Sequence, residues 1–221
     1  MSRALLPYQG MHLGEPILVC GLGPSVREFK PPPGLVTIGV NDCDRFFAPT
    51  YLFCCDPLKR FLPERRAWIE GSGAKLIFKY PSKGKQGEAD REALAGKDVV
   101  WIEEMGVRSG RALDGKLHYH ATSVYPAIIL ACWFGAGRIG VLGCDLDFRD
   151  QPQHALRSYK KSMSIVYALT ALCGSLAQQG HDVRNISPIG RLEIPRADLH
   201  WLVTGEEGCK ERLCRIETRS T

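Results

Sequence analysis

The sequence lacks the cysteine spacing that marks zinc sites and redox centres, because no C-x-x-C occurs anywhere in it. Its nine cysteines are an odd number, and most lie inside apolar runs such as Phe53-Cys54-Cys55. This pattern is typical of small buried residues in a reducing compartment and not of a disulfide framework. Only Cys209 and Cys214, in a basic tail, are spaced as a metal-binding or disulfide pair could be.

Long apolar segments are also missing. No run approaches the roughly 18 apolar residues of a membrane span, and the N-terminus carries no apolar stretch of the signal-peptide kind. Charged residues make up 24% of the 221 residues and the net charge is only +5, so nothing indicates nucleic-acid binding. A modest attraction to phosphorylated or acidic substrates follows. The chain is predicted to be soluble and cytoplasmic.

Strand-like and helix-like segments alternate along the chain. Short apolar runs, several of them rich in β-branched residues, predict strands at 17–20, 35–40, 51–55, 75–79, 98–102, 138–142 and 182–185. Helices are predicted at 59–70, 123–134 and 156–179. Exposed loops are predicted at 81–97 and, as a loop or lid, at 104–121.

This alternation predicts an α/β fold of the Rossmann-like type, with a mainly parallel sheet and helices on both faces. One nucleotide-binding domain is expected to span residues 1–196. The charged tail at 197–221, which contains Trp201, is expected to pack peripherally.

The most specific motif follows the first predicted strand. Gly21-Leu22-Gly23 breaks the strand, and Pro24-Ser25 resembles a first helical turn, where the fixed φ of proline is favourable. The two glycines allow a tight turn and the close approach of a ligand, while a helix N-terminus offers N–H groups to an anion. The five residues are therefore predicted to hold the phosphates of a nucleotide.

Polar residues recur where other predicted strands end, at the edge where open α/β sheets bind ligands. They are Asn41, Asp42, Asp56, the segment Gly143-Cys144-Asp145 and the segment Asn185-Ile186-Ser187. Each one alone is explained by the turn and cap preferences of these residue types. Their repetition at one edge favours a functional site.

Side-chain chemistry suggests a role for each of these groups. Asn41 and Asp56 suit hydrogen bonds to ribose hydroxyls or base edges. Thr122 and Ser123, just before the apolar helix, can donate to a phosphate and cap that helix.

Candidates for the chemical step follow the strand at 138–142. Asp145 and Asp147 are two residues apart, so they share one face of an extended segment, as metal-binding or proton-transfer pairs do. A turn cap is an equally good interpretation of Asp147. His154, in the next loop, is a candidate general base, with a surface histidine as the alternative. Asp56, Asp145 and Asp147 are candidate ligands of Mg²⁺.

The order of these motifs resembles that of the 6-hydroxymethylpterin diphosphokinase MptE-like family, which includes motility-associated-factor glycosyltransferases and many bacterial and phage proteins. The matching segments are G-L-G-P-S at 21–25, I-G-V-N-D at 38–42, C-D-P at 55–57, T-S-V-Y at 122–125, L-G-C-D at 142–145 and N-I-S-P at 185–188. The same order is similar to that of the family 42 bacterial sialyltransferases, whose glycine turn also reads G-x-G-P-S. Those enzymes have asparagine at the positions of Leu22 and Asp56. The resemblance covers most of residues 16–195, with the middle unmatched.

The resemblance implies a Rossmann-like fold that binds a nucleotide as a sugar donor or a pyrophosphate donor. Carried over residue by residue, it implies that the glycine turn lies near the phosphates, Asn41 near the base or ribose, Ser123 at a phosphate, and Asp145 at the reacting edge. We therefore expect a transferase, and favour a glycosyltransferase that moves a sugar from a nucleotide sugar to a hydroxyl acceptor. A homo-oligomer is compatible with the sequence.

Three alternatives stay open. The first is an ATP-dependent diphosphokinase of the MptE-like kind that uses Mg²⁺. The second is an NAD-dependent oxidoreductase, since Asp42 lies about 20 residues past the glycine turn, although Val26 replaces the third glycine of G-x-G-x-x-G. The third is a nucleotide-binding protein of the same fold without catalytic activity.

Overall fold

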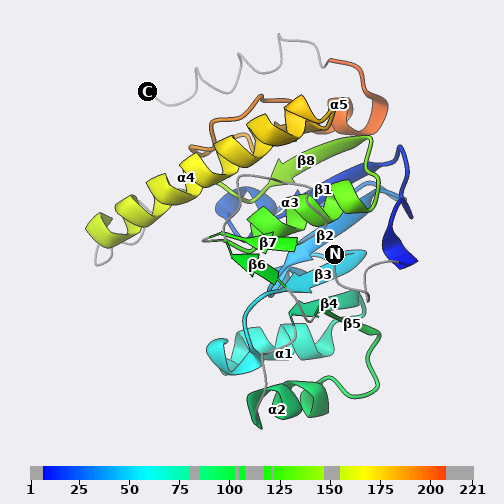
Figure 1. Cartoon of the computed structure of the whole chain (residues 1–221), viewed down its shortest axis with the longest axis vertical. Coiled ribbons are helices and arrows are strands. Elements are labelled where there is room, and N and C mark those ends of the chain that lie inside the picture. Colours follow the sequence, from blue (N-terminus) through cyan, green and yellow to red (C-terminus); the bar gives the residue numbers. More distant parts are fainter. Residues whose placement is uncertain are drawn as a thin grey trace.

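A seven-stranded parallel sheet forms the centre of the molecule. The structure is a computed structural model that describes residues 7–79, 85–102, 105–107, 117–120, 122–146 and 155–207. The strands are β1 (Pro16–Cys20), β2 (Val36–Val40), β3 (Tyr51–Cys54), β4 (Lys75–Lys79), β5 (Val99–Ile102), β8 (Arg138–Leu142) and β9 (Asp182–Asn185). Their order is β5-β4-β3-β2-β1-β8-β9, and every neighbouring pair is parallel (Figure 1).

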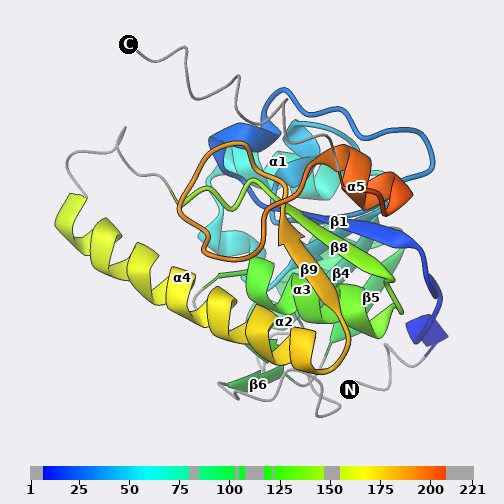
Figure 2. The same ribbon diagram turned by 90° about the horizontal axis from the view of Figure 1, so that it is seen from above.

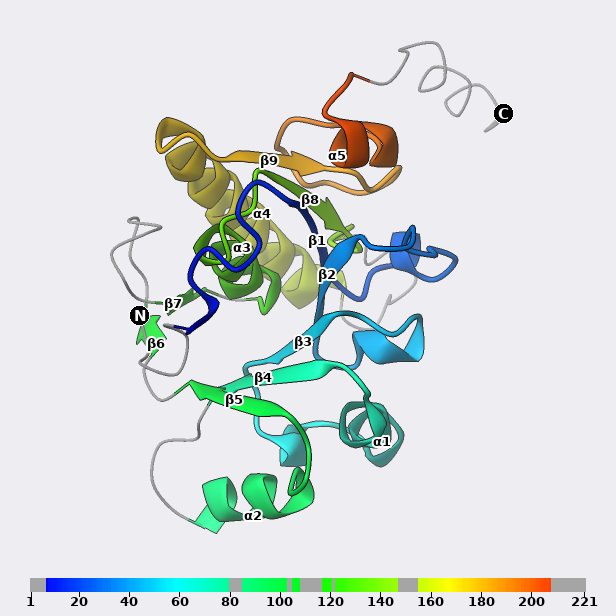
Figure 3. The ribbon, with the colours of Figure 1, turned by 90° about the vertical axis from the view of Figure 1, so that its right-hand side faces the viewer.

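Helices cover both faces of this sheet. They are α1 (Pro63–Gly71), α2 (Lys85–Ala93), α3 (Val124–Trp133), α4 (Ala155–Gln178) and α5 (Leu199–Thr204). Helices α3 and α4 pack on one face, and α1 and α5 lie on the other (Figure 3). Nine of the ten residues of α3 are buried, because the helix is enclosed between the sheet and α4. The predicted α/β fold is confirmed.

Three short 3-10 turns follow β1, β2 and β3. They are η2 (Pro24–Val26), η3 (Cys43–Arg45) and η4 (Leu58–Arg60). The helix predicted to begin at Pro24 is therefore a single turn. Proline occupies its first position, as its fixed φ favours.

Two predicted loops contain regular structure. Residues 85–93, expected to be part of an exposed loop, form α2. Leu94, which follows this helix, is buried, and the Leu58 N–H donates to Asp90 Oδ1 at 3.3 Å, which ties the charged segment to the η4 turn. In the region expected to be a lid, β6 (Met105–Val107) and β7 (Leu117–Tyr119) form a small parallel pair. Leu117 is fully buried, and β7 packs against α3. Residues 108–116 lie outside the described residues.

The start of the expected tail belongs to the core. Helix α5 contacts β1 and β8, and its Trp201 is only 2% exposed. The guanidinium carbon of Arg184 lies 4.3 Å from the centre of the Trp201 ring. Figure 2 shows α5 above the β1–β8 part of the sheet. The peripheral packing expected of this segment is thus not found at 199–204.

The cysteines of the described segments are buried free thiols, as their apolar sequence context predicts. They are Cys20, Cys43, Cys54, Cys55, Cys132, Cys144 and Cys173. Cys209 and Cys214 lie outside the described residues. In the part of the chain that the structure describes, no helix has both the length and the apolar character needed to cross a bilayer.

Candidate functional site

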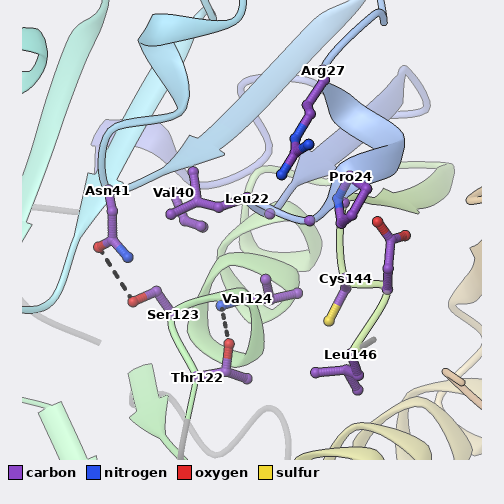
Figure 4. A pocket seen from close by; sticks show the side chains of 14 residues that line it. Leu22, Pro24, Arg27, Val40, Asn41, Thr122, Ser123, Val124, Cys144 and Leu146 are labelled. Atoms are coloured by element: carbon purple, nitrogen blue, oxygen red, sulfur yellow. Dashed lines mark hydrogen bonds between the residues drawn. The ribbon is translucent and has the colours of Figure 1, made fainter. Parts of the chain in front are cut away.

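A cleft of about 320 Å³ opens at the point where the order of the strands reverses. From β1 the chain continues to β2 on one side, and it later returns to β8 on the other side of β1. The loops after β1 and β8 therefore diverge, which is where open α/β sheets bind ligands. The cleft is lined by Gly21, Leu22, Gly23, Pro24, Arg27, Val40, Asn41, Thr122, Ser123, Val124, Gly143, Cys144, Asp145 and Leu146 (Figure 4).

Most of the predicted site residues meet in this cleft. Four segments far apart in the sequence contribute to it: the glycine turn, the end of β2, the start of α3 and the loop after β8. Three predicted ligands, Ser25, Asp42 and Asp56, are not among the lining residues. Asp147 and His154, the remaining candidates for the chemical step, lie outside the described residues.

The glycines of the turn allow two loops to touch each other. The Gly21 N–H donates to the Leu142 carbonyl and the Gly23 N–H to the Gly143 carbonyl, both at 2.7 Å. A Cβ atom on Gly23 would lie 2.5 Å from Asp145 Oδ2, and one on Gly21 would overlap the Gly143 carbonyl. The turn therefore needs glycine for the close approach of the loop after β8.

Asp145 occupies the anion position that the sequence predicts for a phosphate. The Ser25 N–H donates to Asp145 Oδ2 at 2.8 Å, and the Ser25 hydroxyl donates to Oδ1 at 2.7 Å. The Gly143 N–H donates to Ser25 Oγ at 3.0 Å, and Ser187 Oγ lies 3.1 Å from the same atom. Asp145 is 1% exposed. Both donors of Ser25 are therefore paired with the protein's own carboxylate, and the contact of Ser25 with a phosphate stays a prediction.

At the opposite end of the cleft, Asn41 faces the start of α3. Asn41 has a φ of 54°, a left-handed conformation that asparagine tolerates better than most residues. Its Oδ1 accepts from the Ser123 hydroxyl at 3.4 Å, and Thr122 Oγ1 accepts from the Val124 N–H at 3.4 Å. Both distances are long for hydrogen bonds, so these groups retain capacity to bind a ligand. Ser123 occupies the N-cap position of α3 without a side-chain capping bond, contrary to its predicted capping role.

The thiols near the cleft are neutral. Burial raises the pKa of Cys144, which lines the cleft, to about 12, and it does the same for Cys55, which contacts Ser123. The first turn of α3 contains no acidic residue. Asp145 is consequently the only anionic side chain among the described residues that line the cleft.

Asp42 and Asp56 act in ion pairs away from the cleft. Asp42 is fully buried and accepts from both Nε and Nη2 of Arg65, with Arg45 3.4 Å away. Hydrogen bonding to Asp42 raises the pKa of the Arg65 guanidinium. Asp56 pairs with Arg60 at 2.8 Å. The predicted contacts of these two aspartates with a nucleotide are therefore not supported by the structure.

Arg27 is the charged lining residue that sequence reasoning missed. It follows the η2 turn and is exposed, which is the ordinary situation of a surface arginine, so no local signal distinguishes it.

The described residues contain no group of three or more His, Cys, Asp or Glu side chains suited to hold a metal ion. Comparison of the chain with protein-family models finds no matching family, and comparison with curated proteins finds no match either.

Proposed function

We propose that the cleft binds a nucleotide and that the chain is a transferase that uses it as an activated donor. The observation that carries this proposal is the meeting of Asn41, Ser123 and the start of α3 at the switch point of a parallel sheet. The amide of Asn41 suits a base edge or a ribose hydroxyl, since it can both donate and accept. Thr122 and Ser123 suit a phosphate, supported by the positive end of the α3 dipole.

The reaction favoured by the motif resemblance is transfer of a glycosyl group. An acceptor hydroxyl oxygen would form a bond to the anomeric carbon while the bond from that carbon to the phosphate oxygen breaks. The nucleotide leaves with the electron pair, and the hydroxyl proton passes to a base. Donors at the start of α3 would stabilise the leaving phosphate electrostatically. His154 and Asp147 stay our predictions for the base.

Nucleotide binding can be tested with a thermal-shift panel of CMP, UDP, GDP, ATP and NAD, followed by calorimetry with the ligands that stabilise the protein. We expect Asn41→Gly and Ser123→Ala to weaken binding about 10-fold each, as loss of one ligand hydrogen bond does. Glycine accepts the φ of 54° at position 41, so this variant removes the amide without straining the backbone.

Asp56→Asn is the matched control, because Asp56 pairs with Arg60 and does not line the cleft. Its affinity should stay within about 2-fold of the wild type, which is well below the effect of one lost hydrogen bond. Equal effects of Asp56→Asn and Asn41→Gly would contradict the position of the ligand, and no stabilisation by any nucleotide would overturn the proposed function.

Metal dependence separates the favoured reaction from the diphosphokinase alternative. If the start of α3 supplies the stabilisation of the leaving phosphate, most of the transfer rate should persist in excess EDTA. The measurement is the initial rate of nucleotide release from the donor, with and without EDTA and with Mg²⁺ restored. Activity that disappears in EDTA and returns with Mg²⁺ would favour the diphosphokinase.

A further inference from the structure

Arg27 differs from the other arginines close to it in the fold. Arg45 and Arg65 pair with Asp42, and Arg60 pairs with Asp56. The side chain of Arg27 lines the cleft, and no described residue forms an ion pair with it. Figure 4 shows this side chain running from the η2 turn toward the cleft. Its guanidinium is thus the one cationic side chain among the described residues that line this site.

The glycine turn uses its own N–H groups within the protein. Those of Gly21, Gly23 and Ser25 donate to Leu142, Gly143 and Asp145 respectively. The sequence motif suggests that these three N–H groups hold a phosphate. In the structure they are already paired, so they are not free to bind a phosphate in this cleft. The positive charge that it requires has to come from another part of the lining.

The charged side chains of the lining favour some positions of a phosphate in the cleft over others. The buried Asp145 carboxylate repels an anion placed beside it, and this repulsion is stronger in a poorly solvated site than in water. Arg27 and the start of α3 attract an anion. A planar guanidinium also fits two phosphate oxygens at once, which a lysine ammonium does not.

We infer that Arg27 binds the phosphate of the ligand and makes the cleft selective for nucleotides over nucleosides. This inference rests on the proposed function and deepens it by naming the phosphorylated form as the ligand class. The η2 turn, held by the Ser25–Asp145 hydrogen bonds, positions Arg27 over the cleft.

The test compares four nucleosides (adenosine, guanosine, cytidine and uridine) with their 5′-monophosphates by calorimetry. For a base that the wild type binds, we expect the monophosphate to bind about 10- to 100-fold more tightly than the nucleoside, as a charge-assisted contact provides. The quantity compared is the ratio of monophosphate affinity to nucleoside affinity. Arg27→Gln should remove most of this ratio and change the nucleoside affinity less than about 2-fold. Arg27→Lys should keep part of the ratio, because its charge is retained. The wild-type ratio should also fall as salt increases.

Arg66→Gln is the control, because Arg66 pairs with Glu70 on α1 and does not line the cleft. It should leave both affinities unchanged. An Arg27→Gln variant that keeps the wild-type ratio, or one that loses nucleoside and monophosphate affinity equally, would overturn the phosphate role of Arg27 and leave the proposed function intact. A wild-type protein that binds neither form of any base would overturn both.

Discussion

Gly23→Val is expected to destabilise the fold by about 3 kcal/mol or more, at or above the upper end of the usual range for overpacked sites. The first atom of the new side chain would lie 2.5 Å from Asp145 Oδ2 and 2.8 Å from the Gly143 carbonyl oxygen. The loops after β1 and β8 would have to separate, which breaks the hydrogen bonds between Ser25 and Asp145. For a chain of this size, the melting temperature should fall by roughly 6–12 °C or more.

The matched control is Gly174→Ala. Gly174 lies inside α4, and a Cβ atom there meets nothing within 4 Å. Alanine at this position should stabilise the protein by about 0.5–1 kcal/mol, because glycine is unfavourable in a helix. If Gly23 instead lies against a phosphate, as the glycine motif predicts, Gly23→Val would abolish nucleotide binding in a protein that stays folded. A variant with the wild-type melting temperature and no nucleotide affinity would support that phosphate contact and contradict the loop-contact role of Gly23.

Asp42→Ala should also be strongly destabilising, by about 2–4 kcal/mol. Removal of one partner from a fully buried pair costs about 3–5 kcal/mol, and the cost is smaller here because Arg65 is one-third exposed and regains water. Urea unfolding measures the loss. The affinity of the folded variant for a nucleotide should not change, because Asp42 does not line the cleft.

Asp98→Ala is the control for this experiment. Asp98 pairs with Lys75 at the surface, so its removal should change stability by less than about 1 kcal/mol. If Asp42→Ala were as stable as the wild type but bound NAD more weakly, Asp42 would be a ribose ligand. The oxidoreductase alternative would then be favoured over a transferase.

The amino-acid sequence by itself determined the seven strands of the main sheet, the two longest helices and the edge of that sheet at which the cleft opens. The apolar runs that end at Cys20, Val40 and Leu142 form strands because their side chains are buried on both faces of a parallel sheet. The strand that ends at Cys20 leads into the glycine turn, and the one that ends at Val40 leads into Asn41. These are local patterns, and the regular structure that they specify is local as well.

Only the tertiary structure decided which groups at that edge are free to bind a ligand. Ser25 and Asp145 are 120 residues apart in the chain, and their hydrogen bonds depend on β8 returning to lie beside β1. The pairing of Asp42 with Arg65 depends in the same way on α1 folding against the turn after β2. These contacts occupy polar groups that the sequence presents as ligand-binding, and Arg27 acquires its position over the cleft from the same packing. Hydrogen bonds and ion pairs form between whichever groups the fold brings within about 3 Å, and that proximity is a property of the packed chain and not of any segment alone.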